Sequence, residues 1–349
     1  METMKAIQFT APNTAEFNEV PMPAMEDHEV LVRVHYVGVC GTDIELYTGE
    51  MNYIKRGLTT YPLIPGHEWA GEVVKIGPHT KGITIGDRVT GDVSLGCGNC
   101  KMCKEGRYNL CPDRGVIGSY KNRDGAFAEY IRVPYKNIYK LPENVSMKEG
   151  ALVECAATSA YAVMKSRIKY GDTVLVIGDG PIANLALQAA FANGASRGFV
   201  VGSWEEKLEL AREMGAEATF NYRKDDIVAE IQTLTDGAGV DIVYECSGST
   251  KAVNQSIDVV APGGKVVLLS WYDPQEFVTA VNMIVAKDAE LIGVLASPNA
   301  FAPTIAQMSR GAIKSEQLIT QVYPLEQAEN AIKMIMEKKE YRMKVLLEV

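Results

Sequence analysis

The sequence has no long apolar run and no cluster of basic residues, and both absences restrict what the protein can be. No stretch approaches the roughly 18 apolar residues of a membrane-spanning helix, so no membrane partner is expected. The net charge is -9 and no segment is rich in Lys and Arg, which argues against a nucleic acid partner because phosphate backbones bind clustered cations. Residues 1–9 show no cationic stretch followed by an apolar core, so a cytoplasmic location is expected.

Internal repeats and low-complexity segments are also absent, and the remaining composition is that of a globular protein. The chain has 349 residues, of which 47% are apolar and 23% charged. Because a single hydrophobic core rarely grows beyond about 250 to 300 residues, this length predicts two domains.

Four of the seven cysteines follow the spacing C-x2-C-x2-C-x7-C: Cys97, Cys100, Cys103 and Cys111. Four thiolates form the closed tetrahedral shell of a structural zinc. An iron–sulfur cluster is the alternative, because the first three cysteines have ferredoxin-like spacing and a proline follows the fourth. A ferredoxin places its fourth cysteine after three residues, however, whereas seven intervene here. The spacing therefore favours zinc.

Cys40 and His67 are a second pair of possible zinc ligands, and Thr42 places a hydroxyl close to them. Taken alone, a single Cys and a single His are more often buried core residues. The region alternates polar and apolar residues at 29–34 and 71–77 and enters another such stretch at 125–133, which predicts a mostly β domain. Both side chains would then lie on loops near strand ends.

Residues 151–165 are rich in helix-forming residues and predict a helix that carries Glu154 and Cys155. Either side chain could bind a metal. Either could equally be an ordinary packed helix residue.

From residue 172 the pattern alternates between strand and helix. The apolar run 173–177 leads into Gly178-Asp179-Gly180-Pro181-Ile182-Ala183, a G-x-G-x-x-A turn placed before a helix. This context predicts a dinucleotide site at Gly178, Gly180, Pro181 and Ile182, where backbone N–H groups at the helix N-terminus receive a pyrophosphate. Further strands are predicted at 197–201, 239–246, 264–269 and 290–295, with helices at 205–214, 225–234 and 251–260. The pattern indicates a doubly wound parallel sheet.

The end of the strand at 197–201 bears on which nicotinamide cofactor is used. An NAD enzyme usually has an acid here, about 20 residues after the glycines, to accept from the ribose hydroxyls. This chain has Gly202-Ser203-Trp204 instead. Ser203 and Lys207 could bind a 2′-phosphate, so the sequence favours NADP over NAD. The alternative is that Glu205 or Glu206 serves the ribose of NAD, although both are expected in the first turn of a helix.

Together these features resemble the zinc-dependent medium-chain alcohol dehydrogenases, and among them the sorbitol and polyol dehydrogenase-like branch. The motifs that carry the resemblance span the chain in the family's order: Cys40-Gly41-Thr42-Asp43, Gly66-His67-Glu68, the four cysteines, 125–130, the Glu154 helix and the Gly178 turn. The resemblance implies a GroES-like catalytic domain over 1–153 and 292–349 and a Rossmann domain over 154–291. It also implies a homodimer or homotetramer.

The resemblance further implies roles for individual residues. Cys40 and His67 match catalytic zinc ligands, Glu68 a carboxylate that binds or lies near this zinc, and the four cysteines a structural zinc site. Thr42 matches the hydroxyl of a proton relay, and Asp43 the carboxylate that orients the ligand histidine.

Two positions depart from the family pattern. Glu154 and Cys155 stand side by side where either could be the third catalytic ligand, and Glu154 is favoured. Glu45 replaces the relay histidine, and its pKa would have to rise for proton transfer near neutrality.

The expected activity is the reversible, NAD(P)-dependent oxidation of a secondary alcohol, such as a polyol, a sugar or a sugar derivative, to its ketone. A threonine-type or simple alcohol dehydrogenase is the nearest alternative. A dinucleotide-binding protein that has lost catalysis is the alternative from another functional class.

Overall fold

The computed structural model describes residues 2–272, 280–337 and 339–349, and the chain divides into two compact units. The first unit comprises Met1–Glu154, Phe301–Ser309 and Ser315–Val349, and the second comprises Cys155–Ala300 and Arg310–Lys314. The sequence placed the return to the first domain at residue 292, whereas the first unit resumes at Phe301.

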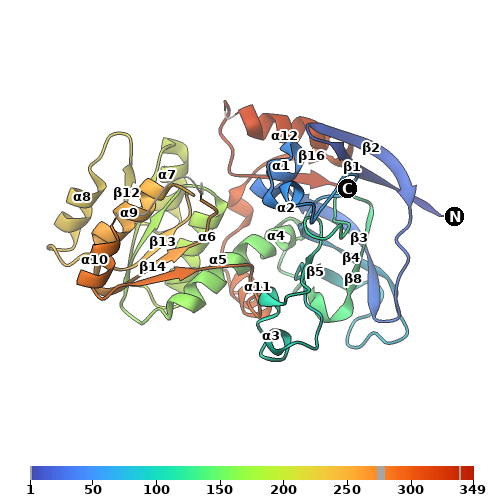
Figure 1. Cartoon of the computed structure of the whole chain (residues 1–349), viewed down its shortest axis with the longest axis horizontal. Helices are drawn as coiled ribbons and strands as arrows, with labels where there is room; N and C mark the ends of the chain where they lie inside the picture. Colours follow the sequence, from blue (N-terminus) through green and yellow to red (C-terminus); the bar gives the residue numbers. More distant parts are fainter. Residues whose placement is uncertain (1, 273–279, 338) are drawn as a thin grey trace. The chain divides into compact units, whose positions relative to one another are not determined.

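The first unit is built mainly of short strands (Figure 1). Its strands are β1 (Thr3–Ala11), β2 (Thr14–Pro21), β3 (Glu29–Gly38), β4 (Glu68–Ile76), β5 (Arg88–Gly91), β6 (Ser94–Leu95), β7 (Gly115–Val116), β8 (Tyr130–Pro134), β9 (Ile138–Lys140), β16 (Ile319–Pro324) and β17 (Lys344–Glu348). Its helices are α1 (Gly41–Thr48), α2 (Asn52–Lys55), α3 (Lys101–Lys104), α4 (Met147–Ala151), α11 (Phe301–Ser309) and α12 (Ala328–Glu337), with short 3-10 turns at Tyr108–Leu110, Tyr135–Asn137, Glu316–Leu318 and Leu325–Gln327.

The main sheet of this unit has seven strands, in the order β16-β17-β3-β4-β5-β9 with β8 paired to β3. The strands predicted at 29–34 and 71–77 are confirmed as parts of β3 and β4, which pair antiparallel. The C-terminal strand β17 pairs with the far end of β3, where Leu346 lies opposite Gly38. The last residues of the chain therefore lie beside the loop that carries Cys40.

The second unit alternates strands and helices along the sequence. Its elements are α5 (Val153–Ser166, which begins in the first unit), β10 (Thr173–Ile177), α6 (Pro181–Ala192), β11 (Arg197–Gly202), α7 (Glu205–Glu213), β12 (Ala218–Asn221), α8 (Ile227–Leu234), β13 (Val240–Glu245), α9 (Thr250–Val259), β14 (Val260–Leu268), α10 (Val281–Ala286) and β15 (Glu290–Gly293).

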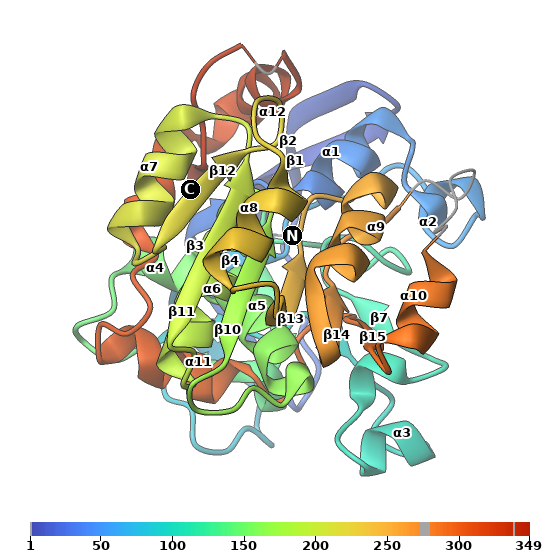
Figure 2. The ribbon, with the colours of Figure 1, turned by 90° about the vertical axis from the view of Figure 1, so that its left-hand side faces the viewer.

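The six strands β10 to β15 form one parallel sheet in the order β12-β11-β10-β13-β14-β15. Several of these strands are visible side by side in Figure 2. In β10, Leu175 and Ile177 pack into a core with α8 and α9, while Val174 and Val176 on the opposite face are also fully buried. Burial on both faces explains why the run is continuously apolar. The order confirms the predicted doubly wound, Rossmann-type sheet. The sequence did not predict β12.

Local signals explain most helix boundaries, with one correction. Pro181 is at the first position of α6, where its missing N–H costs no hydrogen bond. The single helix predicted for 151–165 is wrong at its start, because α4 ends at Ala151 and α5 begins at Val153. The capping box of Ser146 and Glu149 begins α4 as a separate turn. No helix among the described residues is both long and apolar enough to span a bilayer.

Candidate metal and cofactor sites

Cys40 lies between β3 and α1, where the main chain changes from extended to helical. It is the N-cap residue of α1, and its N–H donates to Oδ2 of Asp43 at 2.8 Å. Asp43 is fully buried. A carboxylate at the third helical position satisfies a backbone donor that the helix itself cannot. Asp43 therefore fixes the backbone from which the Cys40 thiol projects.

The same carboxylate also holds His67. Oδ1 of Asp43 lies 3.5 Å from Nδ1 of His67 and accepts from the N–H of Gly66 at 3.3 Å. Burial lowers the pKa of His67, but Asp43 and Cys40 outweigh it and raise that pKa well above its usual value. The surroundings of the imidazole thus favour positive charge, which a metal cation would also supply.

Glu68 completes a group of three possible metal ligands. Ligand atoms of Cys40, His67 and Glu68 all lie within 4.8 Å of one another. A thiolate, an imidazole and a carboxylate are the donor types that zinc takes, so these residues fit a zinc ion.

A buried lysine lies beside this group. The ammonium of Lys344, the first residue of β17, pairs with the carboxylate of Glu68, and the two side chains are 5% and 0% exposed. It also donates to the carbonyl of Val39 at 3.2 Å. A Cβ at Gly38 would overlap the Glu68 carboxylate and lie 2.9 Å from Cε of Lys344, so glycine makes room for this pair.

Glu154 is on the first turn of α5, close to the same group. Carboxylate oxygens of Glu154 and Glu68 lie within 4.8 Å of one another. Burial and the charge of Glu68 raise the pKa of Glu154 to about 7, although His67 and Lys344 act in the opposite direction. Two carboxylates this close together, of which Glu68 is fully buried, are more easily ionised beside a cation. Cys155, the next residue, is 3% exposed.

Thr42 and Glu45 both lie on α1, three residues apart on one side of the helix. Both are partly buried. Burial and the nearby Glu50 raise the pKa of Glu45, and Lys55 lowers it only in part. The direction of this shift is the one that proton transfer near neutrality requires.

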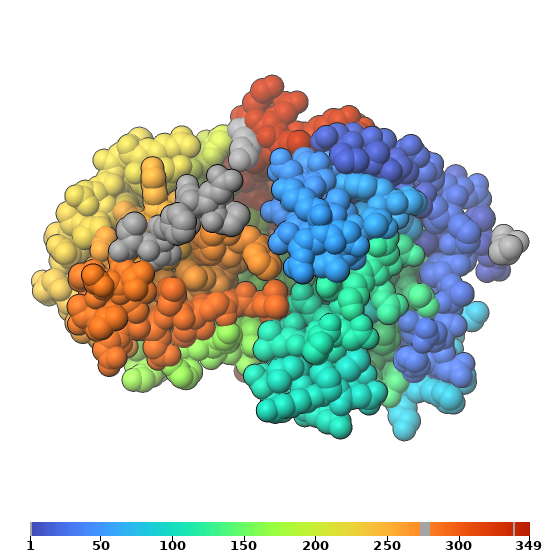
Figure 3. Space-filling view, viewed as in Figure 1, coloured from blue at the N-terminus to red at the C-terminus, as the bar shows by residue number. Residues whose placement is uncertain are grey.

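The four cysteines predicted to form the second metal site also come together. Their sulfur atoms lie within 4.8 Å of one another, around the short helix α3: Cys97, Cys100, Cys103 and Cys111. Backbone N–H groups point at the sulfurs, for example from Cys100 to Sγ of Cys97 at 3.4 Å. The segment belongs to the surface of the first unit (Figure 3, teal).

Crowding of these thiols separates their pKa values. Donation by the N–H groups of Asn99 and Cys100 lowers the pKa of Cys97 to about 6, while desolvation and the neighbouring sulfurs raise that of Cys103 to about 12. A cation bound among the four sulfurs would offset the repulsion between neighbouring thiolates. The cluster therefore fits a zinc ion bound by four cysteines.

The glycine turn of the second unit leaves the N-terminus of α6 accessible. Gly178 adopts φ +127°, a conformation that glycine tolerates, and its N–H donates to the carbonyl of Val201 at 2.8 Å. Gly180 is the N-cap of α6, and a Cβ there would meet no atom within 4 Å. The carbonyl of Ile182 accepts from the hydroxyl of Ser159 at 3.0 Å. These features fit a pyrophosphate bound at the helix N-terminus.

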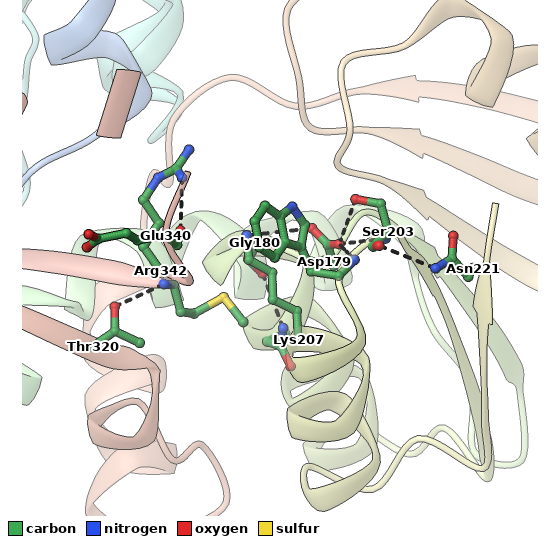
Figure 4. A network of polar contacts seen from close by, with 11 residues as sticks. Asp179, Gly180, Ser203, Lys207, Asn221, Thr320, Glu340 and Arg342 are labelled. Carbon is green, nitrogen blue, oxygen red and sulfur yellow. Dashed lines mark hydrogen bonds and ion pairs between the residues drawn. The ribbon is translucent and has the colours of Figure 1, made fainter. Parts of the chain in front are cut away.

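Asp179 of the glycine turn contacts both Ser203 and Lys207 (Figure 4). Its Oδ2 accepts from the Ser203 hydroxyl at 3.4 Å, and its Oδ1 is 3.8 Å from Nζ of Lys207. Neither Asp179 nor Lys344 was predicted from the sequence as a member of its site. The signal for Lys344 was a charged residue directly before the apolar run 345–347 of β17. The signal for Asp179 was an acid at a variable position of the glycine motif.

Comparison with known proteins agrees with this architecture. Residues 26–143 match the model of the alcohol dehydrogenase GroES-like domain, and residues 181–310 match that of the zinc-binding dehydrogenases. The chain is 32% identical to a sorbitol dehydrogenase of Bacillus subtilis over 346 residues, which is 99% of this chain and 97% of the relative. The chain belongs to the zinc-binding alcohol dehydrogenase family.

Another relative has a name that points to a different substrate. This chain is 37% identical to an L-threonine 3-dehydrogenase of Pyrococcus horikoshii over 294 residues, which is 84% of this chain and 83% of the relative. A Sinorhizobium meliloti structure described as a zinc-binding dehydrogenase bound to NADP has a TM-score of 0.92 and 32% identity, and covers 100% of both chains. The predicted family and enzyme class are confirmed: this dehydrogenase is an NAD(P)-dependent zinc oxidoreductase. The roles of single residues stay predictions.

Proposed function

We propose that this dehydrogenase interconverts a secondary alcohol and its ketone, with a polyol, a sugar or a sugar derivative as substrate and NADP favoured over NAD. The observation that carries the chemistry is the group of Cys40, His67 and Glu68, whose ligand atoms lie within 4.8 Å of one another. The resemblance to the Bacillus subtilis sorbitol dehydrogenase supports the substrate class. A cytoplasmic location remains the prediction from the sequence.

The catalytic metal would be held by Cys40, His67 and Glu154, and Glu68 would bind it or lie close by. When bound, zinc supplies the Lewis acidity that lowers the pKa of an alcohol hydroxyl, and the nicotinamide accepts the hydride. Asp43 holds the imidazole in place. Thr42 accepts the hydroxyl proton, and Glu45, with its raised pKa, is the next proton acceptor.

The preference for NADP rests on Gly202, which leaves the end of β11 without an acid of its own. Ser203 and Lys207 would bind the 2′-phosphate. The NADP-bound structure from Sinorhizobium meliloti supports the same choice.

A metal analysis combined with a substrate screen tests this function. The purified protein is expected to contain two zinc ions per chain and to reduce NADP or NAD with members of a panel of polyols. Keto-sugars should support the reverse reaction. One zinc per chain together with no turnover of any alcohol would instead indicate a dinucleotide-binding protein that lacks catalysis.

A pair of threonine variants on α1 tests the assignment of the proton acceptor. Thr42→Val removes the hydroxyl at nearly constant shape and should lower kcat by about 10²-fold or more, with zinc content and cofactor affinity unchanged. Thr48→Val is the matched control, because Thr48 ends the same helix and its hydroxyl donates to the carbonyl of Glu45 at 3.4 Å. Equal activity of the two variants would reject Thr42 as the acceptor.

L-Threonine is the second candidate substrate, because the similarity to the Pyrococcus horikoshii enzyme reaches 37% identity. Including L-threonine in the panel separates the two. A specificity constant for threonine well above that of every polyol would replace the polyol proposal.

A homodimer or homotetramer is proposed on the basis of the second unit. Within the described part of the chain, β15 forms an edge of the six-stranded sheet, and edges with apolar side chains favour pairing with another chain. Val285 on α10 is 78% exposed and Leu291 on β15 is 42% exposed. Light scattering should show a dimer or tetramer that Val285→Lys weakens, while Met336→Lys, an exposed site in the first unit, should have no effect.

A further inference from the structure

The end of β11 has no side chain of its own, but a carboxylate lies at this position. A Cβ at Gly202 would be 2.6 Å from Cβ of Asp179 and 2.8 Å from its Oδ2. Asp179 follows β10, the strand next to β11 in the sheet. Its side chain therefore fills the space in which a side chain at position 202 would begin.

The Asp179 carboxylate uses donors at the start of α7. Its Oδ2 accepts from the N–H of Ser203 at 2.7 Å, from the N–H of Trp204 at 3.1 Å and from the Ser203 hydroxyl at 3.4 Å. Figure 4 shows Asp179 and Ser203 joined by these contacts. Ser203 is also one of the residues proposed above to receive the 2′-phosphate, so an incoming phosphate would compete with Asp179 for it.

The second carboxylate oxygen faces the other proposed phosphate ligand. Oδ1 of Asp179 is 3.8 Å from Nζ of Lys207, and the two side chains are only 16% and 15% exposed. At this low exposure the two charges are screened less by solvent than a surface pair would be. Asp179 thus offsets the charge of Lys207, a cation proposed above to bind the 2′-phosphate.

The loop around this carboxylate is fixed by a second acid. Nδ2 of Asn221, at the end of β12, donates to the carbonyl of Ser203 at 3.3 Å, and Oδ2 of Asp225 accepts from the N–H of Asn221 at 2.7 Å. Ser203 is therefore held from both sides, so it cannot easily move away from Asp179.

We propose that Asp179 is a specificity-determining residue that stands in for the missing acid at the end of β11 and limits the preference for NADP. A 2′-phosphate carries about 1.5 to 2 negative charges, which a neighbouring carboxylate repels. The ribose 2′-hydroxyl of NAD can instead donate to a carboxylate. This inference rests on the cofactor site proposed above and implies that the dehydrogenase binds both cofactors.

The test compares dissociation constants rather than turnover. Asp179→Asn keeps an oxygen that can accept from Ser203 and Trp204 but removes the charge. Titration of zinc-loaded protein with NADPH and NADH, followed by nicotinamide fluorescence at fixed ionic strength, gives both constants. The ratio of the NADH constant to the NADPH constant should rise by about tenfold or more, because apposed like charges oppose binding.

The matched control is Glu209→Gln, which removes a negative charge from the same helix, α7. The Glu209 side chain is 61% exposed, so screening should keep the change in the ratio below about twofold. If Asp179→Asn folds poorly, Asp179→Ser provides a shorter neutral acceptor for the same measurement.

An unchanged or lower ratio in the Asp179 variants would overturn the inference, and so would an equal loss of affinity for both cofactors. The expected shift in a protein that oxidises no alcohol would support the inference and reject the proposed enzymatic function. Binding of neither cofactor by the unmodified protein would overturn both proposals.

Discussion

Replacing Lys344 with Met should destabilise the first unit, because it removes the ammonium that faces the buried carboxylate of Glu68. The two side chains are 5% and 0% exposed, so water cannot replace the lost charge. Removing one partner of a buried ion pair costs about 3–5 kcal/mol. The hydrogen bond to the Val39 carbonyl at 3.2 Å is lost as well, and its net contribution is about 1 kcal/mol.

Urea unfolding of chelator-treated protein measures this cost without a metal ion that would offset the charge of Glu68. Trp69, which is 1% exposed, lies in the first unit, whereas Trp204 and Trp271 belong to the second. In a Trp204→Phe, Trp271→Phe background, tryptophan fluorescence therefore reports the first unit alone. Lys344→Met should lower the free energy of unfolding of this unit by about 3–5 kcal/mol.

The double variant Glu68→Gln, Lys344→Met distinguishes lost charge compensation from lost packing. Glutamine has nearly the shape of glutamate without its charge, so the double variant should be clearly more stable than Lys344→Met alone. A loss below about 1 kcal/mol for Lys344→Met, or a double variant no more stable than the single one, would refute this account of the pair.

Three further predictions concern a ligand, a titration and a backbone contact. Glu154→Ala should lose one of two zinc ions by metal analysis while Cys155→Ala keeps both, and the reverse ranking would make Cys155 the ligand. Burial acts to raise the pKa of Asp87. The ammonium of Lys140, whose Nζ is 2.8 Å from Oδ2 of Asp87, and hydrogen bonds from Thr84 outweigh burial and lower this pKa below its usual value. The stabilisation from Asp87 is then present above the unfolded pKa of about 3.9 and is lost as pH falls through the lower folded pKa. The loss of thermal stability caused by Asp87→Asn should therefore shrink between pH 6 and pH 3 in scanning calorimetry. A loss that stays constant over this range would contradict the prediction. Gly71→Ala would place a Cβ against a backbone carbonyl of β3 and should cost about 1–3 kcal/mol in urea unfolding, whereas Gly41→Ala, with no atom within 4 Å, should not.

Much of the fold could be predicted because its signals are local. The apolar run of β10, the glycine turn and Pro181 follow one another in the chain, and the physical constraints on each act within a few residues. The cysteine spacing likewise predicted a cluster whose sulfurs the structure brings together. The break at Leu152 between α4 and α5 was missed, since helix propensity is favourable on both sides of it.

The sequence by itself determined which donor types are present: a thiol at Cys40, an imidazole at His67 and a turn that fits a dinucleotide. Only the tertiary structure decided which charges face them. Lys344 reaches Glu68 because β17 pairs with β3 at the far end of the chain. Asp179 reaches the end of β11 because parallel strands align their carboxyl ends. Electrostatic interactions depend on distance in space and on burial, and neither quantity can be read from separation along the chain.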